Sequence, residues 1–104
     1  RALAAQHCRP GAPLLTSDKL REQLACLPGW TPTGNRIEKG YGFADYHRTI
    51  AFVNAVASVA HAEDHHPDMV VHYDRCTIAW STHSAGGVTL NDCICAAKVE
   101  ALAA

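Results

Sequence analysis

The feature that most constrains the fold is a long helical pattern that lies between two hairpin patterns. Residues 47–64 place Phe52, Val56 and Val59 at helical spacing on one face. Pro67 requires the helix to end before it, because proline lacks a backbone donor and restricts the preceding residue. The pattern predicts that the two hairpins belong to one sheet and that this helix packs against it.

Four segments show the composition and alternation of strands, and they are expected to pair as 30–33 with 36–46 and as 69–73 with 76–82. Gly34-Asn35 would turn the first hairpin and Asp74-Arg75 the second. In the last strand, Cys76, Ile78 and Trp80 fall on one face. That face should point into the core.

Two further helices are predicted on either side of this central unit. The first begins at Thr16 or Ser17 and is stopped by Pro28-Gly29. The second begins at Thr89, with Asp92 three residues later as in a capping box. Residues 1–16 read as an irregular lead-in. The predicted fold is α+β: one domain over residues 1–104, with a four-stranded antiparallel sheet, helices packed on one face, and the order α-β-β-α-β-β-α.

Composition excludes several classes of function. Nine basic and ten acidic residues give a net charge of −1 without a basic stripe, which argues against nucleic-acid binding. No apolar run approaches the roughly 18 residues of a membrane span. The five cysteines form no paired C-x-x-C motifs, so reduced thiols in a cytoplasmic protein are expected rather than a zinc site.

Histidines recur where the predicted elements end. His65 and His66 lie at the end of the long helix before Pro67, His83 follows the last strand, and Asp92 lies in the first turn of the last helix. Histidine is the side chain that exchanges protons most readily near neutral pH. If these ends meet in one cleft, the set favours acid–base catalysis.

Other interpretations compete with this one. His61 and His65 stand at i, i+4, as zinc ligands often do, but Ala62 occupies the position of the metalloprotease glutamate, and we expect no metal. The helix-end histidines would also suit the helix dipole without any further role. The remaining polar and aromatic candidates have structural interpretations: Asp92 as a cap, Tyr73 and Trp80 in the core, and His7 and His72 on the surface.

The spaced set resembles the pterin-4a-carbinolamine dehydratase family. The matching residues are His61, His65-His66-Pro67, Tyr73, His83 and Asp92, with Phe43-Ala44-Asp45-Tyr46, Ala51-Phe52, Thr82 to Gly87 and Asn91 around them. The resemblance covers roughly residues 8–100. Cys8 to Pro13 look like the bacterial members associated with phenylalanine hydroxylase. One residue departs from the pattern: His61 stands where many relatives have a carboxylate.

The resemblance implies dehydration of 4a-hydroxytetrahydrobiopterin to quinonoid dihydropterin, in support of tetrahydrobiopterin recycling, without a cofactor. By position, His65 and His83 would act as acids at the hydroxyl, and His66 would bind the pterin and assist proton transfer. His61, Pro67 and Asp92 would contribute to substrate binding, with Asp92 orienting His83 or holding the amide edge of the ring.

The resemblance also implies a homodimer or homotetramer and a functional link to phenylalanine hydroxylase. A sheet edge, or the last helix with Ile94, Ala97 and Ala101, could supply the subunit contact. The alternative function is non-catalytic: a dimerisation or regulatory partner of a hydroxylase or a transcription factor.

Overall fold

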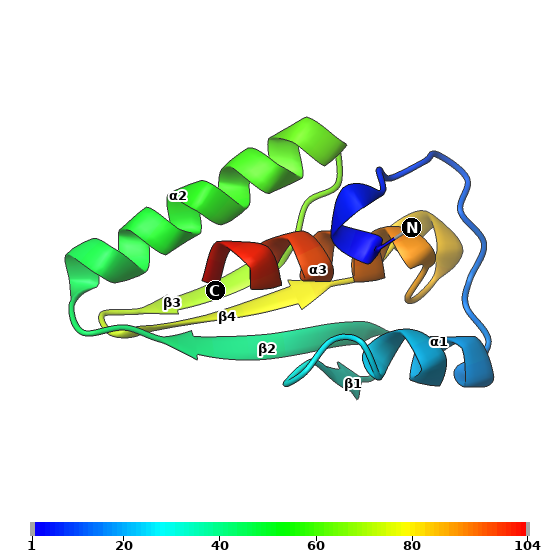
Figure 1. The fold of residues 1–104 in the computed structure, drawn as a ribbon, viewed down its shortest axis with the longest axis horizontal. Coiled ribbons are helices and arrows are strands. Elements are labelled where there is room, and N and C mark those ends of the chain that lie inside the picture. Colours follow the sequence, from blue (N-terminus) through cyan, green and yellow to red (C-terminus); the bar gives the residue numbers. More distant parts are fainter. Residues whose placement is uncertain (1, 104) are drawn as a thin grey trace.

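The computed structural model describes residues 2–103 and contains a four-stranded antiparallel sheet with the strand order β1-β2-β4-β3 (Figure 1). The elements in chain order are η1 (Leu3–Ala5), α1 (Ser17–Leu24), β1 (Thr31–Thr33), β2 (Arg36–Gly42), α2 (Tyr46–Glu63), β3 (Asp68–His72), β4 (Arg75–Trp80), η2 (His83–Ala85) and α3 (Leu90–Ala103). Apart from the two short 3₁₀ turns, this is the predicted α+β order, which is confirmed.

One face of the sheet forms the floor of the core. Ile37 pairs with Trp80 and Tyr41 with Cys76 across β2 and β4, so their side chains share this face. Ile37, Cys76 and Trp80 are fully buried. Helices α2 and α3 lie over this face, as Figure 1 shows. The sequence prediction that Cys76, Ile78 and Trp80 point inward is confirmed.

The ends of α2 are set by local chemistry. The side chain of Asp45 accepts a hydrogen bond from the Arg48 amide at 2.8 Å, which caps the N-terminus of the helix. At the other end Asp64 adopts a left-handed backbone conformation, with φ of 50° and ψ of 44°. This conformation ends the helix. The chain therefore leaves α2 in a fixed direction, and His65 follows directly.

A partly buried carboxylate ties α3 to the sheet. One oxygen of Glu100 accepts hydrogen bonds from the indole of Trp30, the ammonium group of Lys39 and the hydroxyl of Tyr41. Hydrogen bonds to a charged group are stronger than those between neutral groups. This network fixes α3 over β2, and with it the first turn of α3 near the end of β4.

Some details differ from the predictions. β2 ends at Gly42 rather than at residue 46, because Asp45 is needed to cap α2. Tyr73 was expected in the core, but it lies in the turn between β3 and β4 and is 71% exposed. The lead-in is partly ordered, with the η1 turn and a bridge between Leu14 and Thr89. Within residues 2–103, no helix is long and apolar enough to cross a membrane.

Candidate active site

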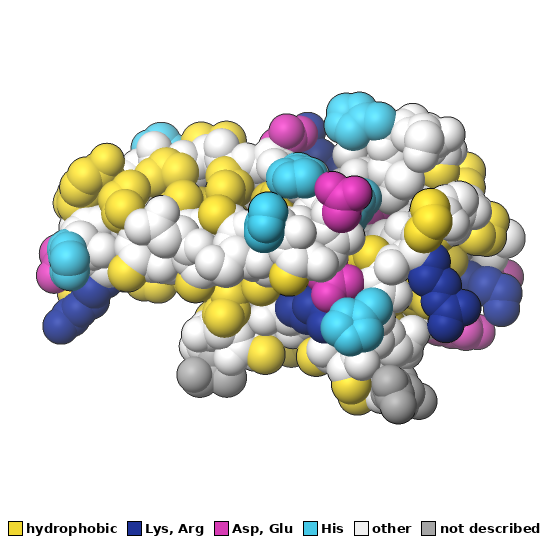
Figure 2. Space-filling view, turned by 90° about the horizontal axis from the view of Figure 1, so that it is seen from above, with side chains coloured by type: hydrophobic (Ala, Val, Ile, Leu, Met, Phe, Trp, Pro, Cys, Tyr) yellow, Lys and Arg dark blue, Asp and Glu magenta, His cyan; other side chains and the backbone are white. Residues whose placement is uncertain are grey.

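Three element ends meet beside the core. His65 follows the left-handed residue that ends α2, Thr82 follows β4, and Asp92 lies in the first turn of α3. Figure 2 shows histidine and acidic side chains gathered near the C-terminal end of α2, beside hydrophobic side chains along that helix. The convergence that the sequence analysis required for a shared cleft is therefore present for His65 and Asp92.

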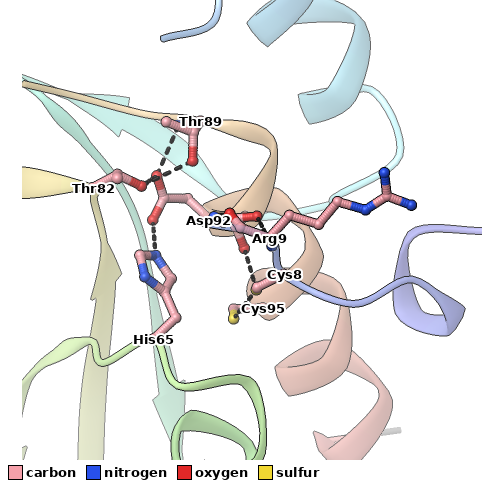
Figure 3. A network of polar contacts seen from close by, with 8 residues as sticks. Cys8, Arg9, His65, Thr82, Thr89, Asp92 and Cys95 are labelled. Atoms are coloured by element: carbon pink, nitrogen blue, oxygen red, sulfur yellow. Dashed lines mark hydrogen bonds and ion pairs between the residues drawn. The ribbon is translucent and has the colours of Figure 1, made fainter. Parts of the chain in front are cut away.

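Asp92 is the centre of a polar network (Figure 3). Its side chain is fully buried, and one carboxylate oxygen lies 2.6 Å from Nε2 of His65. The other oxygen accepts hydrogen bonds from the hydroxyl of Thr82 and the amide of Thr89, both at 2.8 Å. The bond from the Thr89 amide is one half of the capping box predicted from sequence.

This network determines which nitrogen of His65 carries a proton. An ionised carboxylate can only accept hydrogen bonds, so His65 must present Nε2–H to Asp92. The hydroxyl of Thr82 donates to the same carboxylate, so the hydroxyl of Thr89, 2.9 Å away, must donate to Thr82. Every donor of this network is then matched, and Nδ1 is the nitrogen of His65 that the network does not use.

Trp80 fixes the plane of the His65 ring. The two rings stack with their centroids 5.5 Å apart and 14° between their planes. The His65 side chain keeps 15% of its surface exposed, while Trp80 is fully buried. Stacking on one face and a hydrogen bond at one edge leave the imidazole with little freedom to rotate. Such preorganisation is what proton transfer requires.

A cavity of about 320 Å³ opens beside His65, a volume at the lower end of the range of small-molecule sites. Its lining comes from four parts of the chain: the lead-in, the end of α2, the segment after β4 and the start of α3. The lining residues are Cys8, Arg9, Pro10, Gly11, Ala12, Glu63, Asp64, His65, Thr82, Ser84 and Asn91. The lining residues therefore include one imidazole, two hydroxyl side chains and two carboxylates, besides the backbone of the lead-in.

The other predicted site residues are not among those that line this cavity. His61 and His66 are exposed near the end of α2, with Pro67 directly after them. His83 is also exposed and begins η2 between Thr82 and Ser84, which both line the cavity. The carboxylate of Asp92 contacts His65, whereas the sequence analysis expected it either to orient His83 or to hold the amide edge of the ring.

The sequence analysis missed the part that Thr82, Asn91 and residues 8–12 take in the site. Thr82 and Asn91 stood only as neighbours of predicted residues, and no spacing rule connects either of them to its partner. The lead-in is irregular, so its position over α3 depends on tertiary contacts alone. Within residues 2–103, no group of three or more His, Cys, Asp or Glu side chains is arranged to hold a metal ion.

Comparison with known proteins gives a consistent result. Residues 13–102 match the family model described as pterin 4 alpha carbinolamine dehydratase. A protein of that name from Chromobacterium violaceum is 54% identical over 97 residues, which span 91% of this chain and 90% of that protein. A protein of the same name from Nitrosospira multiformis is 45% identical over 103 residues, which span 96% of this chain and 91% of that protein.

A solved structure agrees with the sequence relatives. The crystal structure described as a transcriptional coactivator/pterin dehydratase from Brucella melitensis superposes with a TM-score of 0.83 and 33% sequence identity. The superposition covers 86% of this chain and 98% of that one. The similarity therefore extends over nearly the whole of both folds.

Proposed function

The chain belongs to the pterin 4 alpha carbinolamine dehydratase family, and we propose that it removes water from 4a-hydroxytetrahydrobiopterin to give quinonoid dihydropterin. The observation that carries this proposal is the His65–Asp92 pair beside a cavity of small-molecule size. The reaction breaks the bond from C4a to the hydroxyl oxygen. One proton must reach that oxygen, and the ring nitrogen must lose its own proton as the new double bond forms.

His65 is the proposed acid at the hydroxyl. In its protonated form it carries hydrogens on both nitrogens, and the carboxylate of Asp92 stabilises the positive charge through Nε2–H. Transfer of the Nδ1 proton to the hydroxyl oxygen releases water and leaves the neutral tautomer that Asp92 already favours. General acid catalysis by a positioned side chain contributes about 10²–10⁴-fold to a rate.

The remaining residues have proposed roles that follow from their positions. His83 would act as a second acid at the hydroxyl, and His66 would bind the pterin and assist transfer of the ring proton. His61 and Pro67 would border the bound substrate. Asp92 is fully buried with both oxygens hydrogen-bonded, so we assign it to orienting His65 rather than to direct contact with the pterin.

The proposal is tested by stopped-flow absorbance of enzymically generated 4a-hydroxytetrahydropterin, with and without the protein. The native chain should accelerate the decay, and His65→Ala and His83→Ala should each slow it about 10²-fold or more. His47→Ala is the matched control, because His47 is exposed at the start of α2, and its rate should equal that of the native chain. A folded native chain without effect on the decay would refute the proposal.

The wider setting is also a proposal. The activity would regenerate a reduced pterin in the cytoplasm for a hydroxylase such as phenylalanine hydroxylase, and it would need no cofactor. The exposed strand β3, with Val70 58% and Val71 40% exposed, supports self-association into a dimer or tetramer. Sedimentation equilibrium at several protein concentrations would measure that state.

A second candidate function is regulatory rather than catalytic. It is favoured by the description of the Brucella melitensis structure as a transcriptional coactivator as well as a pterin dehydratase. A His65→Ala/His83→Ala double variant should then still restore the phenotype of a deletion strain. If this variant fails to restore the phenotype while the native chain does so in the same strain, the regulatory role is contradicted and only the enzymatic role remains.

A further inference from the structure

Within the lead-in, residues 1–16, a short stretch packs against the candidate site. Residues 8–12 are consecutive in the chain, and all five line the cavity that also contains His65 and Thr82. Figure 3 shows Cys8 and Arg9 beside Asp92 and Cys95 of α3. A segment without regular secondary structure keeps such a position only if specific side chains hold it.

Asn91 supplies the first of these restraints. Its side-chain amide donates to the carbonyl oxygen of Arg9 at 2.8 Å, and its side-chain oxygen accepts from the Arg9 amide at 3.0 Å. Asn91 is only 9% exposed, so water competes little for these bonds. Two opposed hydrogen bonds to one residue fix both the position and the direction of the backbone there.

Glu63 supplies the second restraint. Its carboxylate accepts from the amide of Cys8 at 2.7 Å and from Nδ1 of His7 at 2.8 Å, with the ammonium group of Lys98 at 3.7 Å. The Glu63 side chain is 6% exposed. Burial acts to raise the pKa of Glu63, but the bonds from Cys8 and His7 and the charge of Lys98 outweigh it, so the pKa lies below the ordinary value. The carboxylate is therefore ionised at neutral pH and accepts the hydrogen bonds from Cys8 and His7.

These restraints leave polar backbone groups available at the cavity. The hydrogen bonds to Glu63 and Asn91 use the backbone of Cys8 and Arg9, and they do not use the peptide groups of Gly11 and Ala12. Gly11 has φ of 75°, a left-handed value that glycine adopts without steric cost, and the space around its Cα is open. A pterin is a flat ring with hydrogen-bond donors and acceptors along one edge, which backbone N–H and C=O groups can match.

We propose that residues 8–12 form one wall of the pterin site, and that Asn91 and Glu63 are positioning residues that hold this wall in place. The proposal rests on the proposed function of the same cavity. It assigns substrate binding to backbone groups of the lead-in, while the chemical step stays with the histidines. Loosening the wall should therefore weaken binding of substrate and transition state equally, which raises KM and leaves kcat unchanged.

The central experiment compares Asn91→Ala with the matched control Asn54→Ala, an exposed amide on α2. Steady-state kinetics should show KM about tenfold higher for Asn91→Ala with kcat within about twofold, and native values for the control. Binding of 7,8-dihydrobiopterin, a stable pterin, should weaken by the same factor. Alanine has the higher helix propensity, so lost helix stability would not explain the result.

Two further measurements separate positioning from folding. Hydrogen exchange at the amides of Cys8 and Arg9 should be slow in the native chain and faster at Arg9 in Asn91→Ala. Added 7,8-dihydrobiopterin should slow exchange at Gly11 and Ala12. Gly11→Ala is a second variant for the case that Asn91→Ala does not fold, and its strained turn should also raise KM without changing kcat.

The outcomes distinguish this proposal from the function on which it rests. A native chain without activity and without pterin binding would refute the proposed function. An active native chain whose KM stays unchanged in Asn91→Ala and Gly11→Ala, despite faster exchange at Arg9, would overturn the proposal about the wall. A loss of kcat at unchanged KM would also overturn it, because the segment would then act on the chemical step.

Discussion

Nε2 of His65 lies 2.6 Å from the buried carboxylate of Asp92, although the two residues are 27 positions apart in the chain. The contact joins the end of α2 to the first turn of α3, across the end of β4. It joins a histidine whose side chain is 15% exposed to a carboxylate that has no exposed surface. Most of the candidate site can be understood from this pair and from the groups that hold it.

Replacing Asp92 by Asn should lower the rate sharply while the fold survives. The Asn side chain is the same size, but its NH₂ group would face the donors that now point at the carboxylate, so His65 would lose its preferred tautomer. We expect kcat to fall on the order of 10²–10⁴-fold. Stopped-flow kinetics measures the rate, and near-UV circular dichroism checks the fold. A variant with native kcat would show that Asp92 is only a helix cap.

Thr82→Val and Thr82→Ser form a matched pair for the buried network. Valine keeps the shape but removes the hydroxyl that links Asp92 to Thr89, which should cost about 1–3 kcal/mol of unfolding free energy. Serine keeps the hydroxyl and should cost less. Urea denaturation of both variants measures the difference. Equal stability of the two would mean that the hydroxyl contributes nothing to the network.

Glu100 should make stability depend on pH. Burial acts to raise the pKa of Glu100, but hydrogen bonds from Lys39, Tyr41 and Trp30 outweigh it and hold the pKa below the ordinary value. A depressed pKa contributes stability above the pKa of the unfolded state, and this contribution is lost as the pH falls through the folded pKa. The free energy of unfolding of the native chain should exceed that of Glu100→Gln at pH 7, and this gap should narrow towards pH 3. Urea denaturation at both pH values tests this, and a constant gap would contradict it.

The thiols should differ widely in reactivity. Cys26 is exposed, whereas burial and then the nearby charge of Asp92 raise the pKa of Cys93 to about 12. Because the thiolate is the reactive form, an aromatic disulfide reagent should modify Cys26 quickly and Cys93 only after unfolding. Mass spectrometry of peptides from the partly modified protein identifies the sites. Early modification of Cys93 would indicate that α3 opens locally in the native state.

The sequence determined the helices and strands because their signals are local. Pro67 and the apolar spacing predicted a helix that the structure places at Tyr46–Glu63, and alternation identified the buried face of β4. Capping by Asp92 follows from its distance to Thr89 along the chain. These features depend on residues a few positions apart, so neighbouring side chains suffice to predict them.

Only the tertiary structure decided which side chains meet. Nothing local indicates that Asp92 binds His65 rather than His83, that Tyr73 is exposed in a turn, or that Asn91 holds Arg9 across 82 positions. Each of these outcomes depends on how α2, β4, α3 and the lead-in pack together. Packing decides them because distant elements bring partners within hydrogen-bond reach only after the core has formed, and a one-dimensional pattern contains no measure of that distance.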